Sequence, residues 1–305
     1  MIDILVIGSL NADLVVRAPH FPAPGETIQG EDLAIITGGK GANQAMAAAK
    51  QGARVAMAGR VGEDGFGSIL IENLNDFGVD TTHIRGDEQA ATGTAMIVVD
   101  SNGQNSIVVS PGANGRVTCE DVDAAVPAME NAKMLLLQFE IPLETVTWAA
   151  SLARKKGLRV ILNPAPARPV PPELFANVDL LIPNETELSQ LSETQVNDID
   201  SVEKAARSLL ARGVQTMIVT LGEKGALVVQ KSGMAHIPAF KVKVVDTTAA
   251  GDAFIGGLAA ALLRGLELEE AVRCGNAAGA LAVTRFGAQT SLPTLDEVQA
   301  LLKKP

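Results

Sequence analysis

The chain has 305 residues, of which 47% are hydrophobic and 20% charged, so it is long enough for about two average domains or one large α/β unit. Its formal net charge of −10 would repel a nucleic-acid backbone, and no cluster of Lys and Arg offsets that charge, which excludes nucleic acid as a partner. The only cysteines, Cys119 and Cys274, are too few for a disulfide framework and favour a reducing, cytoplasmic location.

The apolar stretch MIDILVIGSL at the start of the sequence predicts a first strand rather than a signal peptide, because it lacks a basic region and contains Asp3. The longest apolar run covers residues 253–263, which is well short of the roughly 20 residues that a membrane span needs. We therefore expect no contact with a membrane.

Short aliphatic runs alternate with helical patterns along most of the chain. The predicted strands lie at 3–8, 54–62, 134–139, 159–164, 179–184 and 215–222, and the predicted helices at 43–52, 143–157 and 202–213. Strands that are apolar on both faces and separated by helices are typical of a mostly parallel sheet covered on both sides. The sequence therefore predicts an α/β fold with three layers, a central sheet flanked by helices.

Two stretches interrupt this alternation. Residues 11–36 and 90–111 show no helical period, and the second contains two strands around an Asn102-Gly103 turn. We expect these insertions to form a small antiparallel sheet that acts as a lid on a single α/β domain spanning residues 1–305.

In such folds, ligands bind beyond the carboxyl ends of the strands. The polar residues that follow the predicted strands are Asn11, Asp13, Glu140, Asn163, Asn184 and the loop at Gly222. An isolated Asn or Asp in this position is usually a turn former, so position alone does not assign these residues a function.

The stretch TGGKGANQAMAAA contains Gly38, Gly39 and Gly41 around Lys40, just before an alanine-rich helix. Such a loop could bring backbone N–H groups and a positive charge close to a ligand, or it could be a plain turn into the helix. It does not have the spacing of a P-loop, and VIGSLNAD does not have the glycines of a dinucleotide site. A nicotinamide-dependent dehydrogenase is therefore disfavoured.

The stretch DTTAAGDAFIGGLA places small residues directly before an apolar helix. The N–H groups around Ala250, Gly251 and Asp252 are then uncovered, which together with the helix dipole makes an anion site. From residue type alone, Asp252 fits a helix cap as well as a catalytic carboxylate. A second acid, Asp246, precedes it by six residues.

GGKGANQA and DTTAAGDAFIGGLA resemble the two signatures of the ribokinase (PfkB-type) family of carbohydrate kinases. The resemblance continues in order through GSLNADLVVRAPHFPAPGETIQG, LLLQFEIPLE, NPAPA, PNETE, TLGEKG and TRFGAQTSLP. It implies a ribokinase-like fold and transfer of the γ-phosphoryl group of ATP to a sugar, with the 5-hydroxyl of D-ribose as the expected acceptor. A kinase for deoxyribose, fructose or a nucleoside is the alternative within the family. A non-catalytic sugar-binding or regulatory protein is disfavoured because Lys40, Gly251 and Asp252 are all present.

The resemblance also implies a role for each matching residue. Asp252, kept ionised by the helix N-terminus, would accept the proton of the attacking hydroxyl. The N–H groups of Ala249, Ala250, Gly251 and Asp252 would form an anion hole. The implied sugar-binding residues are Asn11, Asp13, Gly39, Lys40, Gly41, Asn43, Ala95, Ile107, Glu140 and Asp252. The implied ATP-binding residues are Asn184, Thr220, Leu221, Gly222, Glu223, Lys224, Gly225, Gly251 and Asn276, the last of which also fits a helix-packing role.

Two metal ions and one partner complete these expectations. Glu187 would act on Mg²⁺ through water, and a potassium ion would be held by Asp246, Thr248, Ala282, Arg285, Gly287 and Ser291. Arg285 could contribute only its backbone carbonyl, because a guanidinium does not bind cations. An exposed apolar face on the lid predicts a homodimer formed lid to lid. Two features depart from expectation: Ala249-Ala250 stand where the broader family usually has Gly-Ala, and Phe286 is large for a loop beside a cation.

Overall fold

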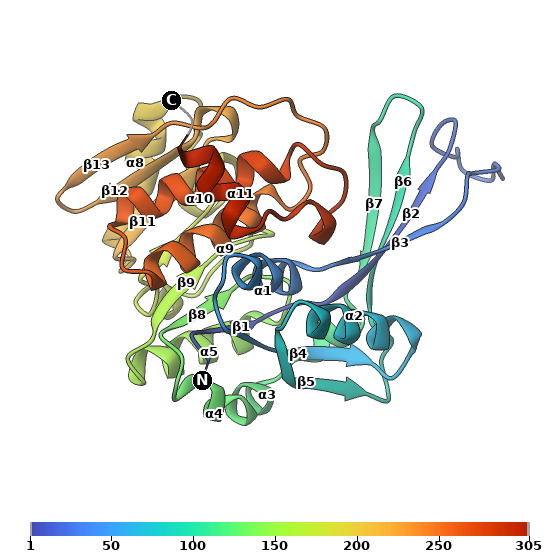
Figure 1. Ribbon diagram of the computed structural model, residues 1–305, viewed down its shortest axis with the longest axis horizontal. Helices are drawn as coiled ribbons and strands as arrows, with labels where there is room; N and C mark the ends of the chain where they lie inside the picture. The colour runs from blue at the N-terminus through green and yellow to red at the C-terminus, as the bar shows by residue number, and fades with distance from the viewer. Residues whose placement is uncertain (1, 304–305) are drawn as a thin grey trace.

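A nine-stranded sheet forms the centre of the computed structural model, which describes residues 2–303 (Figure 1). From β11 to β5 all neighbouring strands pair in parallel, whereas β12 and β13 add an antiparallel hairpin at one edge. In spatial order the strands are β13 (Gly233–Ile237), β12 (Ala226–Gln230), β11 (Thr216–Thr220), β10 (Leu180–Leu181), β9 (Arg159–Leu162), β8 (Met134–Leu137), β1 (Ile4–Ile7), β4 (Val55–Gly62) and β5 (Asp80–Asp87).

The six strands predicted for this sheet are all present, and the mostly parallel α/β fold is confirmed. Three further strands, β5, β12 and β13, were not predicted. β5 and β13 lie at the two edges of the sheet and mix polar with apolar residues, so neither has the continuous aliphatic run of a central strand. β12 reads ALVVQ and is buried, so its composition alone could have identified it.

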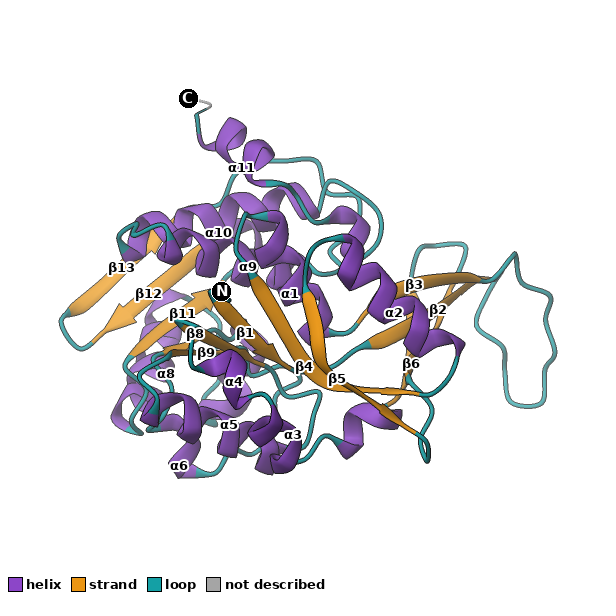
Figure 2. Ribbon diagram, turned by 60° about the horizontal axis from the view of Figure 1, so that its bottom comes forward, coloured by secondary structure: helices purple, strands orange, loops and turns teal. Residues whose placement is uncertain are grey.

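Helices cover both faces of the sheet (Figure 2). Alternate strand residues point to opposite faces, so that Ile4 and Val6 of β1 enter one hydrophobic core while Leu5 and Ile7 enter the other. The first core contains side chains of α1 (Lys40–Lys50), α2 (Gly65–Asp76), α9 (Ala250–Leu263), α10 (Leu268–Ala282) and α11 (Leu295–Leu302). The second contains side chains of α3 (Cys119–Ala124), α4 (Val126–Met129), α5 (Leu143–Lys155), α6 (Pro172–Phe175), α7 (Glu185–Ser192) and α8 (Ile199–Ala211). No helix within residues 2–303 is long and apolar enough to cross a membrane.

The small residues of α9 set how closely this helix approaches its neighbours. A Cβ atom on Gly256 would lie 2.4 Å from the Cβ atom of Ala47 on α1, and one on Gly257 would lie 2.9 Å from the Cβ atom of Ala278 on α10. A larger side chain at either position would push α9 outward. The glycines and alanines after Asp252 therefore serve packing, and they bring the start of α9 against α1.

A second sheet of four strands projects from the carboxyl edge of the first (Figure 1). Its spatial order is β3 (Ala34–Gly38), β2 (Asn11–Arg17), β6 (Gly93–Val99) and β7 (Asn105–Ser110). The two outer pairs are antiparallel, as the sequence predicts, and the central pair β2 and β6 is parallel. β2 follows β1, and β6 follows β5. Because β1 and β5 run in the same direction in the main sheet, β2 and β6 leave it in the same direction and therefore pair in parallel. The β6–β7 turn has Gly103 at φ 78°, in the left-handed region that glycine favours.

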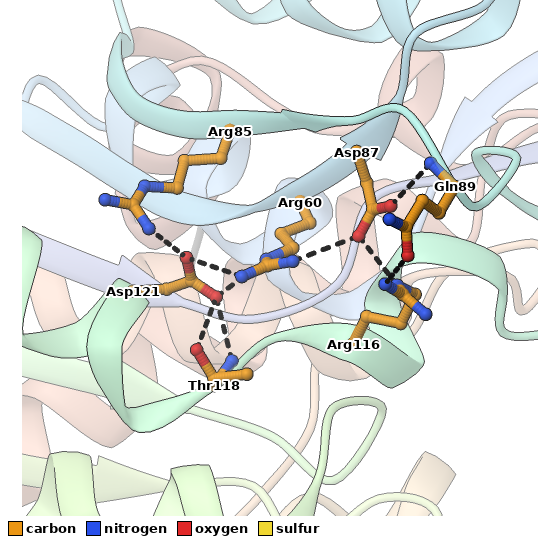
Figure 3. Close-up of polar contacts among 7 residues, drawn as sticks. All are labelled: Arg60, Arg85, Asp87, Gln89, Arg116, Thr118 and Asp121. Atoms are coloured by element: carbon orange, nitrogen blue, oxygen red, sulfur yellow. Dashed lines mark hydrogen bonds and ion pairs between the residues drawn. The ribbon is translucent and has the colours of Figure 1, made fainter.

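A network of charged side chains ties the base of the second sheet to the first (Figure 3). Arg60 of β4 donates to the Oδ2 atoms of Asp121 at 2.8 Å and of Asp87 at 3.0 Å. Arg116, in the 3-10 helix η1 (Gly112–Arg116), donates to Asp87 at 2.8 Å. Asp87 is the last residue of β5, before the chain continues to β6, and η1 follows β7. Both ends of the segment that contains β6 and β7 are therefore fixed to β4. Hydrogen bonds from Arg116 and Arg60 lower the pKa of Asp87 to about 2.

We predict that Asp121→Asn destabilises the fold. The buried Asp121 carboxylate also accepts from Arg85 and from the backbone N–H of Thr118, so the substitution weakens several charge-assisted bonds at once. The free energy of unfolding should fall by about 1.5–3 kcal/mol, measured by urea denaturation. Arg85→Gln is the control, because the Arg85 side chain is half-exposed, and its cost should stay below about 1 kcal/mol. Equal losses for the two variants would contradict a special role for Asp121.

Candidate active site

The candidate residues gather at the carboxyl edge of the main sheet. Asn11 begins β2 directly beyond β1, Glu140 follows β8, and Asn184 follows β10. The N-termini of α1 and α9 reach the same edge, carrying Lys40 and Asp252. Residues separated by more than two hundred positions in the sequence are therefore within hydrogen-bonding distance of each other.

Glu140 joins the β1–β2 connection to the start of α1. Its Oε2 atom accepts from Ser9 Oγ at 2.6 Å and from the backbone N–H of Lys40 at 3.0 Å. The Ser9 hydroxyl accepts from the N–H of Gly41 at 3.3 Å, and a Cβ atom on Gly41 would lie only 2.6 Å from the Ser9 nitrogen. Gly41 thus permits two backbone segments to meet. Ser9 was not among the predicted residues, and a single serine after a strand carries no sequence signal.

Asn11 is held by a residue that the sequence analysis did not single out. The Nδ2 group of Asn114, in η1, donates to Asn11 Oδ1 at 2.7 Å and to the carbonyl of Leu10 at 2.9 Å. The Oδ1 atom of Asn114 accepts from the N–H of Leu10 at 2.9 Å. This buried amide therefore fixes Asn11 and joins the beginning of β2 to the end of the β6–β7 excursion.

Asp13 lies on β2 with its carboxylate over the neighbouring strand β3. A Cβ atom on Gly38 would fall 2.5 Å from Asp13 Oδ2, so the glycine makes room for the carboxylate. Burial, reinforced by the nearby charge of Glu140, raises the pKa of Asp13 to about 7. Ala95 pairs with Asp13 from β6 and is buried, whereas Ile107 lies one strand further out on β7 and is half-exposed.

Asp252 is 5% exposed at the start of α9, and both of its carboxylate oxygens accept hydrogen bonds from α1. Asn43 Nδ2 donates to Oδ2 at 3.0 Å, and Gln44 Nε2 donates to Oδ1 at 3.0 Å. Burial raises the pKa of Asp252, although the positive charge of Lys40 and these two donors oppose the rise. The helix N-terminus was expected to keep this carboxylate ionised; in the structure, the charge of Lys40 and the bonds from α1 favour the ionised form.

Lys40 is a cation surrounded by acids. Burial acts to lower its pKa, but the charges of Asp252, Glu140 and Glu187 outweigh burial and raise it. The ammonium group therefore remains protonated between the β1–β2 segment and the start of α9. This explains why a compact charge stands between the glycines of GGKG.

The turn before α9 offers free backbone donors, but fewer than the sequence predicts. The N–H of Ala250 donates to the carbonyl of Thr247 at 3.3 Å. Within residues 2–303, the N–H groups of Gly251 and Asp252 have no backbone acceptor, and the space where a Gly251 side chain would project is open. Ala249 has φ 57°, a left-handed conformation that costs a residue with a Cβ atom about 1–2 kcal/mol. The consequence of alanine there is backbone strain rather than lost space.

Two cavities with shared lining residues lie along this edge. The larger, about 800 Å³, is lined by the predicted ATP-binding residues except Leu221, together with Phe240, Val244 and Phe254. The smaller, about 190 Å³, is lined by Lys40, Asn163, Glu187 and Asp252. Gly251 and Asn184 border both cavities, so the large cavity adjoins the smaller one that Asp252 lines.

Two of the residues predicted to bind ATP have structural roles. The Leu221 side chain is buried in the second hydrophobic core and does not line the cavity. Asn276 borders the cavity, and its Nδ2 group donates to the carbonyls of Ile237 at 3.0 Å and Pro238 at 3.2 Å. Its amide therefore holds the segment before Phe240, which forms one wall of the cavity. The aromatic residues of this wall, Phe240 and Phe254, were not predicted because phenylalanines in a core have the same sequence context.

Asn184 and Glu187 cap α7 reciprocally. Asn184 Oδ1 accepts from the N–H of Glu187 at 2.8 Å, and Glu187 Oε2 accepts from the N–H of Asn184 at 2.9 Å. Burial raises the pKa of Glu187, while the bond from Asn184 and the charge of Lys40 act in the opposite direction. The carboxylate therefore has a structural role as a helix cap and at the same time borders the smaller cavity.

The residues predicted to hold a monovalent cation lie in two neighbouring loops. Asp246 accepts from the N–H of Gly287 at 2.9 Å and from the hydroxyl of Thr248 at 2.7 Å, which joins the turn before α9 to the loop after α10. The guanidinium of Arg285 pairs with Glu297, which leaves its carbonyl as the group that could face a cation. Ala282 ends α10, and Ser291, in the same loop region, donates to the carbonyl of Ala288 at 2.8 Å. Within residues 2–303, no group of three or more His, Cys, Asp or Glu side chains could hold a metal ion.

A mostly parallel sheet with a long cleft across its carboxyl edge, free helix N–H donors and a buried carboxylate defines an α/β enzyme of the group-transfer class. The profile of the pfkB family carbohydrate kinases matches residues 1–295, and the chain belongs to this family. The ribokinase of Haemophilus influenzae is 43% identical over 298 residues, covering 98% of this chain and 97% of the relative. A deoxyribokinase of Salmonella typhi is 40% identical over 301 residues, covering 98% of each. The solved structure of Arabidopsis thaliana ribokinase complexed with ribose and ATP has a TM-score of 0.93 at 35% identity, covering 100% of both chains.

The raised pKa of Asp13 predicts that this carboxyl destabilises the folded protein at neutral pH. Its pKa is about 7 when folded against an ordinary value of 3.8, so the folded state binds the proton more tightly, and stability falls as pH rises through that window. Asp13→Asn should therefore raise the free energy of unfolding above pH 7 by on the order of 1–3 kcal/mol, with the gain shrinking toward pH 4. Urea denaturation between pH 5 and 8 measures this. Glu31→Gln is the control, because Glu31 is exposed and lies between β2 and β3, and it should show no such trend. A gain that does not depend on pH would contradict the prediction.

Proposed function

We propose that this protein transfers the γ-phosphoryl group of ATP to the 5-hydroxyl of D-ribose, giving ribose 5-phosphate and ADP. The observation that carries the proposal is the position of Asp252. Its buried carboxylate borders the smaller cavity and accepts a hydrogen bond from Asn43, next to the polar cluster of Glu140, Lys40 and Asp13. The relatives named ribokinase, and the similar structure that contains ribose and ATP, support ribose as the acceptor.

In this proposal the sugar lies between the second sheet and α1. Asp13 and Glu140 accept hydrogen bonds from sugar hydroxyls, while Lys40 and Asn11 donate to them. The Oδ1 atom of Asn43 supports this placement, since it is buried and has no partner within the described residues, so a sugar hydroxyl would satisfy it. Gly39 and Gly41 keep the backbone close to the sugar, and Ala95 and Ile107 supply an apolar wall that excludes water when the second sheet closes as a lid.

ATP occupies the larger cavity in this proposal, between the loop 220–225 and the wall that contains Asn276 and Phe240. Its terminal phosphate reaches the smaller cavity, where the N–H groups of Gly251 and Asp252 stabilise charge on the transferred group, with Ala249 and Ala250 shaping the turn. Asp252 accepts the proton from the 5-hydroxyl. Mg²⁺ would neutralise phosphate charge, and Glu187 on the cavity wall is an acid suited to bind its water shell.

We also propose that a potassium ion binds beside the anion hole. Asp246 already connects the turn before α9 with the loop at Gly287, so a cation held by Asp246, Thr248 and the carbonyls of Ala282, Arg285, Gly287 and Ser291 would stiffen the same turn. The chain is proposed to act as one domain with a lid. A cytoplasmic location suits its dependence on ATP and its two thiols, neither of which is in a disulfide.

The second candidate acceptor is 2-deoxyribose. At 40% identity, the deoxyribokinase of Salmonella typhi falls between the ribokinases of Haemophilus influenzae, at 43%, and Staphylococcus aureus, at 38%. The two sugars differ by a single hydroxyl, and a site that hydrogen-bonds that hydroxyl can discriminate strongly against a sugar that lacks it. Ribose, 2-deoxyribose, fructose and a nucleoside should therefore be compared by kcat/KM.

The central prediction is that the protein phosphorylates D-ribose with MgATP, faster with K⁺ than with Na⁺, and that Asp252→Asn lowers kcat by on the order of 10²–10⁴ because the base is lost. Production of ADP measures this in a coupled assay. Asp200→Asn is the control, because Asp200 also lies in the first turn of a helix, α8, but is remote from the cleft. Normal turnover by Asp252→Asn would refute the catalytic assignment, and phosphorylation of none of the sugars would refute the proposed activity.

A homodimer formed through the second sheet is also proposed. Among the strands of residues 2–303, β7 pairs with β6 alone and so has one edge without a partner strand, and its residues Ile107, Val108 and Val109 are exposed. Met96 on β6 stands beside Val108 and is exposed as well. An apolar surface of this kind on a protruding sheet is typical of an interface between proteins.

Light scattering should therefore give a mass of twice 31.6 kDa. Val108→Lys should shift the equilibrium toward monomers, because the side chain is 60% exposed and a charge there would be buried in the dimer. Met234→Lys on β13, another exposed apolar residue of an edge strand, should leave the mass unchanged. A wild-type mass of 31.6 kDa at micromolar concentration would contradict the dimer.

A further inference from the structure

A chain of buried amides ends on the carboxylate of Asp252. Gln44 of α1 has no exposed surface, and its Nε2 group donates to Asp252 Oδ1 at 3.0 Å and to Asn163 Oδ1 at 3.3 Å. Its Oε1 atom accepts from Gln138 Nε2 at 2.7 Å, and Gln138 has no exposed surface either. Asn163 in turn donates to the carbonyl of Ile182 at 3.0 Å. Gln44 and Gln138 border neither cavity, whereas Asn163 lines the smaller one.

The contacts allow only one orientation of the Gln44 amide. The carbonyl of Ile182 requires the Nδ2 group of Asn163, so Asn163 presents its oxygen to Gln44. A rotated Gln44 amide would place its oxygen against that oxygen and against the carboxylate of Asp252, which is unfavourable. Both N–H bonds of the Gln44 amide group are therefore committed, one to each acceptor.

Gln138 packs against the residue that follows β1. A Cβ atom on Gly8 would fall 2.0 Å from Gln138 Oε1, so the absence of a side chain on Gly8 makes room for the Gln138 amide. Its Oε1 atom is buried and has no partner within the described residues, while its Nε2 group donates to Gln44. Gln138, Gln44 and Asp252 thus form a buried chain of hydrogen bonds.

Asn43 and Gln44 differ in how fully their amides are hydrogen-bonded. Asn43 also donates to Asp252, but its own buried Oδ1 atom has no partner within the described residues. Gln44 has its oxygen and both of its N–H bonds satisfied by protein groups. Its bond to Asp252 therefore needs no ligand to complete it.

We propose that Gln44, held by Gln138 and Asn163, is a positioning residue that keeps the Asp252 carboxylate in one orientation and in its charged form. The proposal rests on the proposed function, in which that carboxylate accepts the proton of the sugar hydroxyl. The other charges facing Asp252 are Lys40, which favours the charged carboxylate, and Glu140 and Glu187, which disfavour it. The donor from Gln44 therefore acts in the same direction as Lys40 and Asn43, against the effect of burial.

The test is the pH dependence of kcat/KM for the sugar. A donor to a carboxylate favours its ionised form, so losing the donor raises the pKa of Asp252 and moves the acid limb of the profile to higher pH. Gln44→Met, similar in length but without the amide, should move this limb upward by about one pH unit. Gln44→Glu keeps the size but sets a second acid beside Asp252, so it should move the limb further and lower kcat more.

Two other variants separate this role from a general packing defect. Gln51→Met removes a buried glutamine from the C-terminal end of the same helix, where the amide donates to the carbonyl of Pro293, and it should leave the acid limb at the wild-type pH. Gln138→Met should move the limb less than Gln44→Met does. The double variant should show the same shift as Gln44→Met alone, because Gln138 acts through Gln44.

The outcomes are distinct. A folded Gln44→Met enzyme with a wild-type acid limb would overturn the proposal, as would an equal shift in Gln51→Met. If Gln44→Met does not fold, Gln138→Met decides, and an unshifted limb in that variant overturns the proposal. Full turnover by Asp252→Asn would instead refute the catalytic role of Asp252, and phosphorylation of none of the sugars would refute the proposed function, whatever the glutamine variants show.

Discussion

The close contact between α1 and α9 is the constraint on which the rest of the site depends. Gly256 lets α9 approach α1 at a distance where an added Cβ atom would overlap Ala47. Only at that distance can Asn43 and Gln44 reach the carboxylate of Asp252. The alanines and glycines of the two helices, which at first look like plain helix formers, therefore determine where the proposed base lies. Packing and chemistry are set here by the same residues.

This contact places several acids around one ammonium group. Lys40 interacts with Asp252, Glu140 and Glu187, while Asp13 faces Glu140 and has a pKa near 7. Such a cluster costs folding free energy, because each charge is partly removed from water and the acids outnumber the cation. A polyhydroxyl ligand that donates to the acids, or a cation that accompanies the nucleotide, would relieve this cost. The charges of the cleft thus suit ligands rich in donors and positive charge.

The sequence predicted the parts of this arrangement that have local signals. Buried parallel strands show as aliphatic runs, and polar residues at their ends locate the cleft. The glycine and lysine loop and the acid at the start of α9 were predicted to serve one site, and the structure brings them together. Ser9, Asn114 and Gln138 were not predicted. Their partners lie about a hundred positions away, and a single polar residue at the end of a strand does not reveal which distant atom it will meet.

The two features that departed from expectation also have physical explanations. Phe286 is 55% exposed, and the guanidinium of Arg17, on β2, lies 5.7 Å from the centre of its ring, so this side chain forms a contact between the second sheet and the loop that contains Gly287. Ala249 adopts the left-handed conformation that places the N–H groups of Gly251 and Asp252 toward the cleft without a backbone acceptor. Both residues sit in segments joined by Asp246. The bonds of this carboxylate hold the turn in a conformation that alanine would not adopt on its own, and the strain resides at the point where the proposed reaction needs rigid donors.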